Sequence, residues 1–132
     1  MVVISTSFVN LPTSLPLVKE LKVGEEQVDK TGTTRSNENA STGYYVVSYD
    51  SNNITNTLVK DVTATKKWVD GSDNNRPTVE VELLQNGKSF TPAKTGTISN
   101  DFVNYTWTGV RVNDGNGKPY VYFDLVVPVL ST

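Results

Sequence analysis

Apolar and polar residues alternate along most of the chain with a period of two, which is typical of half-buried β-strands. No long stretch keeps the 3.6-residue period of an amphipathic helix. Turn-forming residues interrupt the alternation at short intervals, for example in "DGSDNN" and "NDGNGK". The pattern predicts strands over residues 2–9, 17–23, 43–49, 53–58, 62–69, 78–85, 104–110 and 119–127. Many short strands at this spacing predict an all-β sandwich or barrel.

Three polar residues occupy positions where the alternation expects an apolar side chain. Lys66 follows the parity of Ala64, and Glu20 and Asn56 interrupt the apolar faces of their own strands. A buried charge is costly unless it is paired, and a buried amide needs hydrogen-bond partners. Two interpretations are open: the three residues lie on the surface of edge strands, as most lysines do, or they meet and satisfy one another.

The composition excludes most kinds of enzyme chemistry. The chain has 132 residues, and neither cysteine nor histidine is among them. Disulfides, thiol nucleophiles and zinc–thiolate sites are therefore excluded, and so are Ser/His/Asp and Cys/His enzymes. Glu80 and Glu82 alternate with Val79 and Val81, which indicates a solvated strand face rather than a hydrolase pair. We predict that the chain is not an enzyme and needs no cofactor.

Charge and hydropathy also bear on the partners. The net charge is −2 with lysines and acids interspersed, which predicts no nucleic-acid partner. No apolar run approaches the roughly 18 residues of a membrane span, and the N-terminus lacks the basic region of a secretion signal. The turn "DGSDNN" offers oxygen atoms to calcium but lacks the glycine and glutamate of an EF-hand loop. We predict a plain turn there and no metal site.

Several segments resemble the CnaB-type domain, the collagen-adhesin B-repeat of Gram-positive surface adhesins and pilins. The stretch "VTATKKWVDGSDNNRPTVEVELLQNGK" resembles the opening half of that domain, and "NYTWTGVRVNDGNGKPYVY" continues it. The stretches "VKEL" and "TGYYVVSYDSNNITNT" resemble its closing half. The resemblance covers residues 18–122 and implies a reverse-immunoglobulin, prealbumin-like β-sandwich.

The resemblance also implies roles for the three polar residues. In the family, a lysine of the first strand and an asparagine of the last strand condense into an isopeptide bond, assisted by a buried acid. By position, Lys66 resembles the nucleophile, Asn56 the amide acceptor and Glu20 the catalytic proton shuttle. A dry pocket would favour a neutral amine and a protonated carboxyl, and contact between the groups supplies proximity. The crosslink would serve as a disulfide does outside the cell.

The order of the two halves departs from the family. Residues 1–58 resemble a closing half behind an unmatched N-terminal strand, and residues 59–132 resemble an opening half, together expected to form one compact domain. Three arrangements follow: a circular permutant, halves of two successive modules, or an exchange of halves between two chains.

The spacing of the reactive residues bears on this choice. The family's first and last strands are parallel neighbours, and a parallel connection needs about a dozen residues. Only residues 57–65 separate Asn56 from Lys66, and several of these belong to strands. We therefore predict that any Asn56–Lys66 bond joins two chains, in an exchanged dimer.

These features predict a structural stalk or spacer module of a bacterial cell-surface adhesin or pilus, within a wall-anchored extracellular parent protein. Its expected partners are neighbouring modules of that protein and, by strand exchange, a second copy. No nucleic acid or membrane is expected to bind. The alternative is a ligand-binding adhesin module that recognises a host protein through its unmatched termini and the polar segment at residues 30–42.

Overall fold

The computed structural model describes residues 16–71, 76–99 and 103–123, and these residues contain strands and no helix. The predicted all-β class is confirmed. The strand predicted over residues 2–9, and the end of the one predicted over 119–127, lie outside the described residues. The strands are β1 (Lys22–Val23), β2 (Glu26–Gln27), β3 (Tyr44–Asp50), β4 (Asn53–Thr65), β5 (Val79–Gln85), β6 (Lys88–Ile98), β7 (Asn104–Arg111) and β8 (Tyr122–Phe123).

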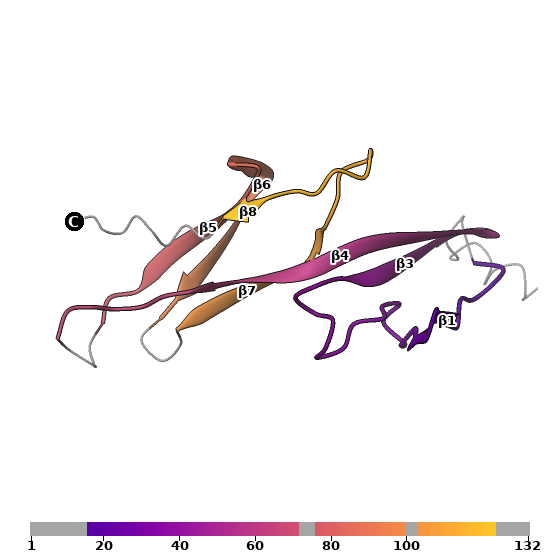
Figure 1. Cartoon of the computed structure of the whole chain (residues 1–132), viewed down its shortest axis with the longest axis horizontal. Coiled ribbons are helices and arrows are strands. Elements are labelled where there is room, and N and C mark those ends of the chain that lie inside the picture. The colour runs from indigo at the N-terminus through magenta and orange to yellow at the C-terminus, as the bar shows by residue number, and fades with distance from the viewer. Residues whose placement is uncertain (1–15, 72–75, 100–102, 124–132) are drawn as a thin grey trace, which may run out of the picture.

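Strand β4, the longest of the described strands, runs along much of the long axis of the molecule (Figure 1). It is the central strand of a three-stranded sheet of order β3-β4-β7, and both of its pairings are antiparallel. The prediction of two separate strands here is wrong, because "NTLVKDVTAT" contains neither glycine nor proline and is rich in β-branched residues that favour strand. The predicted boundary between residues 58 and 59 falls inside β4.

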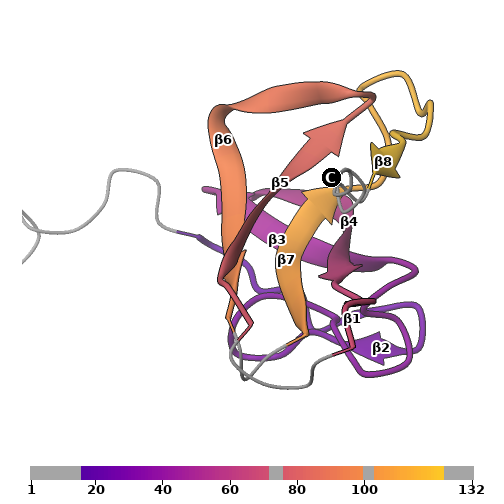
Figure 2. The ribbon, with the colours of Figure 1, turned by 90° about the vertical axis from the view of Figure 1, so that its left-hand side faces the viewer.

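A second sheet, of order β6-β5-β8, covers the β7 end of β4 (Figures 1 and 2). The two layers enclose one apolar core, as the sandwich prediction expects. In β5, Val81 and Leu83 point into this core and Glu80 is exposed, so the alternation of this strand is confirmed. The core residues are Ala64, Val81, Leu83, Ile98, Trp107 and Val110.

The layers approach most closely where β6 crosses β7. Gly96 is buried in β6 and its Cα lies against the ring of Tyr105. That ring also packs edge-on against Trp107, with 4.9 Å between the ring centroids. A glycine at this point of β6 lets the backbone approach an aromatic ring that any larger residue would displace.

The strand predicted over residues 17–23 and the unpredicted strand β6 also differ from the sequence analysis, for identifiable reasons. The strand predicted over residues 17–23 is shortened to β1, and the preceding Leu17 and Leu21 are 71% and 64% exposed. Strand β6 was not predicted, because its side chains are mostly exposed until Gly96 and Ile98 and so show no alternation.

Candidate functional site

Glu20 and Asn56 meet near the start of β4. Asn56 Nδ2 donates a hydrogen bond to Glu20 Oε2 at 3.3 Å, and Glu20 N donates one to Tyr49 Oη at 2.9 Å. The β3–β4 register explains this meeting, because Val47 lies opposite Asn56 and Tyr49 opposite Ile54, which places all four on one face. The carboxyl and the carboxamide of the predicted site are therefore in contact, but Asn56 is exposed to solvent rather than enclosed in the dry pocket that the resemblance implies.

The second oxygen of this carboxyl has no hydrogen-bond partner among the described residues. Glu20 Oε1 is buried and accepts no hydrogen bond among the described residues. An unsatisfied buried acceptor costs about 1–3 kcal/mol, so such an atom calls for an explanation. A hydrogen-bond donor placed at this atom would remove the cost.

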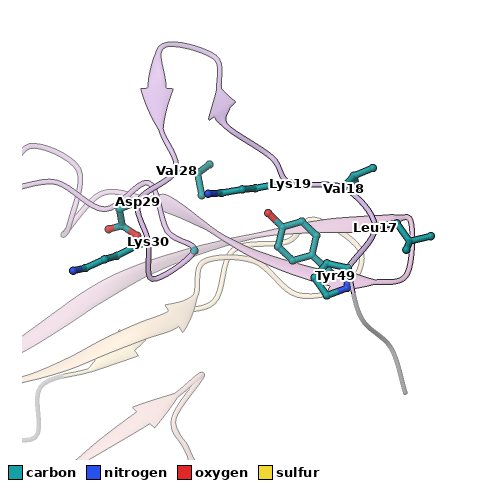
Figure 3. Close-up of a pocket in the computed structure, with 9 residues that line it drawn as sticks. Leu17, Val18, Lys19, Val28, Asp29, Lys30 and Tyr49 are labelled. Atoms are coloured by element: carbon teal, nitrogen blue, oxygen red, sulfur yellow. The ribbon is translucent and has the colours of Figure 1, made fainter. Parts of the chain in front are cut away.

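A shallow pocket of about 490 Å³ lies beside Glu20. Figure 3 shows the ring of Tyr49 in its centre, with Leu17 at one end and Asp29 and Lys30 at the other. The Asp29 carboxylate accepts hydrogen bonds from the hydroxyl and backbone of Thr31, so it shapes the turn there. The pocket thus exposes apolar surface around Tyr49, and Glu20 itself does not line it.

Lys66 lies at the opposite end of β4, directly after the last residue of that strand. Its ammonium is 4.3 Å from the centroid of the Trp68 ring and donates to the Lys67 carbonyl oxygen at 3.4 Å. Lys66 is half-buried and Lys67 is exposed, as their opposite parities predict. About ten extended residues at roughly 3.3 Å each place Lys66 about 33 Å from Asn56. Within one chain, therefore, the amine does not meet the other two groups.

A further polar cluster, which the sequence patterns did not indicate, lies at the middle of β4. Asp61 is only 7% exposed. Its carboxylate accepts hydrogen bonds from Tyr44 Oη at 2.6 Å, Arg35 Nε at 2.7 Å and Gly109 N at 3.1 Å. The one sequence signal is that Asp61 shares the parity of the buried Val59, but the pairing of distant strands decides its partners. The cluster ties both halves of the chain to β4.

Gly109 belongs to this cluster because β7 bulges there. The β4–β7 register shifts between Lys60 and Val62, and β7 accommodates one more residue than β4. Gly109 has a φ of 70°, which glycine adopts without strain. The bulge removes the Gly109 backbone N–H from the β4–β7 ladder, and the Asp61 carboxylate accepts its hydrogen bond instead.

The cluster shifts the pKa of two of its members. Burial raises the pKa of the Asp61 carboxyl, but the hydrogen bonds from Tyr44, Arg35 and Gly109 outweigh burial and leave this pKa below its ordinary value of 3.8. Burial, followed by the hydrogen bond to Asp61 and its charge, raises the pKa of Tyr44 to about 12. An ionised Asp61 and a neutral Tyr44 are therefore the stable pair at neutral pH.

We expect the free energy of unfolding to fall as the pH rises from 10 towards 12. A group whose folded pKa is raised contributes stability that is complete below its unfolded pKa, 10.0 for Tyr44, and is lost as the pH passes about 12. A shift of about two pKa units corresponds to roughly 3 kcal/mol. Urea unfolding at about pH 9 and about pH 12 measures this loss.

The matched variants are Tyr44→Phe and Tyr45→Phe. The first has no hydroxyl to ionise and should lose less stability between the two pH values, whereas the second should lose as much as the unmodified chain. Equal losses in both variants would show that Tyr44 does not carry the alkaline transition.

Two further properties concern the described ranges alone. No helix in them is long and apolar enough to cross a membrane. No group of three or more His, Cys, Asp or Glu side chains in them is placed to hold a metal ion.

The comparisons with known proteins concern the half of the chain that contains Lys66. The family model of the Cna protein B-type domain matches residues 62–123, which include β5, β6, β7 and β8. Comparison with curated proteins and with solved structures gives no match. The likeness of residues 18–58 to a closing half stays a prediction. Residues 62–123 therefore match the Cna protein B-type domain family.

Proposed function

We propose that the chain is a stalk or spacer module of a bacterial cell-surface adhesin or pilus, stapled by a Lys66–Asn56 isopeptide bond between two chains. Cna protein B-type domains are structural parts of extracellular surface proteins. The observation that carries the proposal is the division of the reactive groups between the two ends of β4. Glu20 and Asn56 lie near one end of β4 and Lys66 lies at the other end. Each chain therefore carries both the amine and the carboxamide that an intermolecular bond requires.

The reaction needs no cofactor and occurs once per bond. Lys66 Nζ forms a bond to Asn56 Cγ, and the bond from Cγ to Nδ2 breaks. A proton passes through the Glu20 carboxyl from the attacking amine to the departing nitrogen, which leaves as ammonia. Glu20 already contacts the amide nitrogen that departs, and its second oxygen accepts no hydrogen bond among the described residues.

Denaturing intact-mass measurement is the test. We expect covalent species of two or more chains, each lighter by one ammonia per bond. Lys66→Ala should give only monomers of unreduced mass, because the nucleophile is gone. Lys67→Ala is the matched control, since this exposed neighbour points away, and it should crosslink normally.

The other outcomes decide between the remaining arrangements. A monomer lighter by one ammonia would show that the bond closes within one chain, which contradicts the intermolecular proposal. A monomer of unreduced mass at every protein concentration would exclude the bond.

A ligand-binding module is the second candidate. The pocket beside Tyr49 favours it, because this pocket exposes Leu17 and Val18 to solvent next to the polar segment at residues 30–42. Replacement of Leu17 by lysine should then abolish binding to a host surface protein and leave the covalent species unchanged. In the stapled module, the same substitution should instead slow crosslinking, because Leu17 lies near Glu20.

A further inference from the structure

Among the described residues, strand β4 has neighbours on both sides only at its middle. Val59 pairs with Tyr44 of β3 and with Arg111 of β7, so these two strands lie on opposite sides of it. Before Val59, the described partner is β3 alone, and after it the ladder partner is β7 alone. Two open edges result: the N-terminal half-edge, residues 53–57 on the β7 side, and the C-terminal half-edge, residues 62–65 on the β3 side.

The backbone groups of the N-terminal half-edge point into this open space. Leu58 accepts a hydrogen bond from Val112 N at 3.1 Å, so its carbonyl faces the β7 side. Because backbone groups alternate along a strand, those of Ile54 and Asn56 face the same side, where no described strand lies. Such a row of free groups is a template for another strand.

The C-terminal half-edge is its counterpart on the other side. Asp61 N donates to Ala40 O at 2.7 Å on the β3 side. By the same alternation, the backbone groups of Thr63 and Thr65 face that side, where the described residues provide no partner. Each chain therefore has one open half-edge of each kind, on opposite sides of one strand.

We propose that copies of this chain add head to tail, with the N-terminal half-edge of one copy paired in parallel with the C-terminal half-edge of the next. The two half-edges lie on opposite sides of β4. If the two copies keep the same face of the sheet on the same side, these half-edges can therefore face each other only when both β4 strands run in the same direction. This contact is heterologous, and it leaves one open half-edge at each end of the assembly. Repetition produces an open chain of copies rather than a closed dimer.

Side-chain chemistry favours a second copy as the occupant, and here the inference rests on the proposed function for its register. A register with Asn56 beside Lys66 of the next copy brings a cation to the unpaired Glu20 Oε1. The shift of about ten residues is even, so each side chain stays on its face of the sheet. Ile54, 41% exposed in a single copy, then lies beside the next copy's Ala64 and the core around it. Successive copies repeat at about 33 Å along the strand.

The test uses the full chain with Lys66→Ala, so that no covalent bond can form and pairing is observed alone. Sedimentation velocity over a range of concentrations should show a series of species that lengthens as concentration rises. A monomer at every concentration would overturn the proposal, and so would a dimer that does not grow.

Two proline variants in this background test the pairing more sharply. Thr65→Pro removes an N–H from the C-terminal half-edge, and Ile54→Pro removes one from the N-terminal half-edge, without removing an N–H that pairs with β7 or β3. Each variant alone should stay monomeric, whereas an equal mixture should form a one-to-one dimer and nothing larger. Thr65→Val, which keeps its N–H, should still form the series.

Other outcomes have distinct meanings. Self-association of Ile54→Pro alone would show that two C-terminal half-edges pair with each other, which overturns the head-to-tail arrangement. Sedimentation of the mixture also controls for folding, because misfolded variants would not form a defined dimer. If the series forms while the unmodified chain loses no ammonia, the inference stands and the proposed staple fails.

Discussion

Replacement of Asp61 by alanine should lower the free energy of unfolding by about 3–5 kcal/mol. The carboxylate is the common acceptor for Tyr44, Arg35 and Gly109, and the substitution leaves the buried hydroxyl and the bulge N–H without a partner. Arg35 adds little to this loss, because its side chain is 46% exposed and water can solvate it. Urea unfolding near neutral pH measures the effect.

The control for this substitution is Asp50→Ala. Asp50 is the exposed last residue of β3 and carries the same charge, so its removal should change stability by no more than about 0.5 kcal/mol. Asp61→Asn keeps one acceptor oxygen and should fall between the two. An Asp61→Ala chain as stable as Asp50→Ala would show that the cluster does not hold the two halves of the chain to β4.

The lowered pKa of Asp61 gives the same cluster an acid limit. A group whose folded pKa is depressed contributes stability that is present above its unfolded pKa, 3.8, and is lost as the pH falls through the folded value. The stability difference between the unmodified chain and Asp61→Asn should therefore shrink only below about pH 4.

Replacement of Gly96 by alanine should cost about 3 kcal/mol or more, the upper range for overpacking a core. A Cβ at this position would lie 2.6 Å from Cε2 of Tyr105, well inside van der Waals contact. Neither the β6 backbone nor the Tyr105 ring can move away easily, because Gly96 is paired with Val81 in the sheet and the ring is packed against Trp107. Thermal or urea unfolding measures the loss.

Gly115→Ala is the matched control for this prediction. Gly115 has no neighbour within 4 Å of an added Cβ and does not require a positive φ, so the substitution should be nearly neutral. A second variant, Gly96→Ala with Tyr105→Leu, should recover part of the lost stability by removing the ring. A neutral Gly96→Ala would contradict the close packing of β6 on β7.

The sequence predicted the fold well where one face of a strand is buried. Strands β3, β5 and β7 have clear alternation, and each lies within a residue or two of its predicted bounds. In the sequence, the alternation of β4 resembles two separate strands, because the buried face of β4 changes along its length. Val59 and Asp61 are buried on one face, whereas Ala64 is buried on the other. Only the pairing with β3 and β7 shows that the strand continues through this change.

The candidate site was predictable in part for a similar reason. The spacing of Asn56 and Lys66 along the chain already implied that they do not meet within one copy, and the extended β4 gives the separation. The Asp61 cluster was not predictable, because its partners Tyr44 and Gly109 lie 17 and 48 residues away and are set by strand register and a bulge. Neither appears in the local pattern of residues.

The central claim is that Lys66 of one copy reaches Glu20 and Asn56 of another. Protease digestion of the covalent species, followed by tandem mass spectrometry, tests it most directly. We predict a branched peptide in which Lys66 Nζ is joined to the side chain of Asn56 with loss of ammonia, and in which mixed isotope-labelled and unlabelled copies contribute the two arms. Unbranched Lys66 and Asn56 peptides alone, or branched peptides whose arms always come from the same copy, would contradict the account.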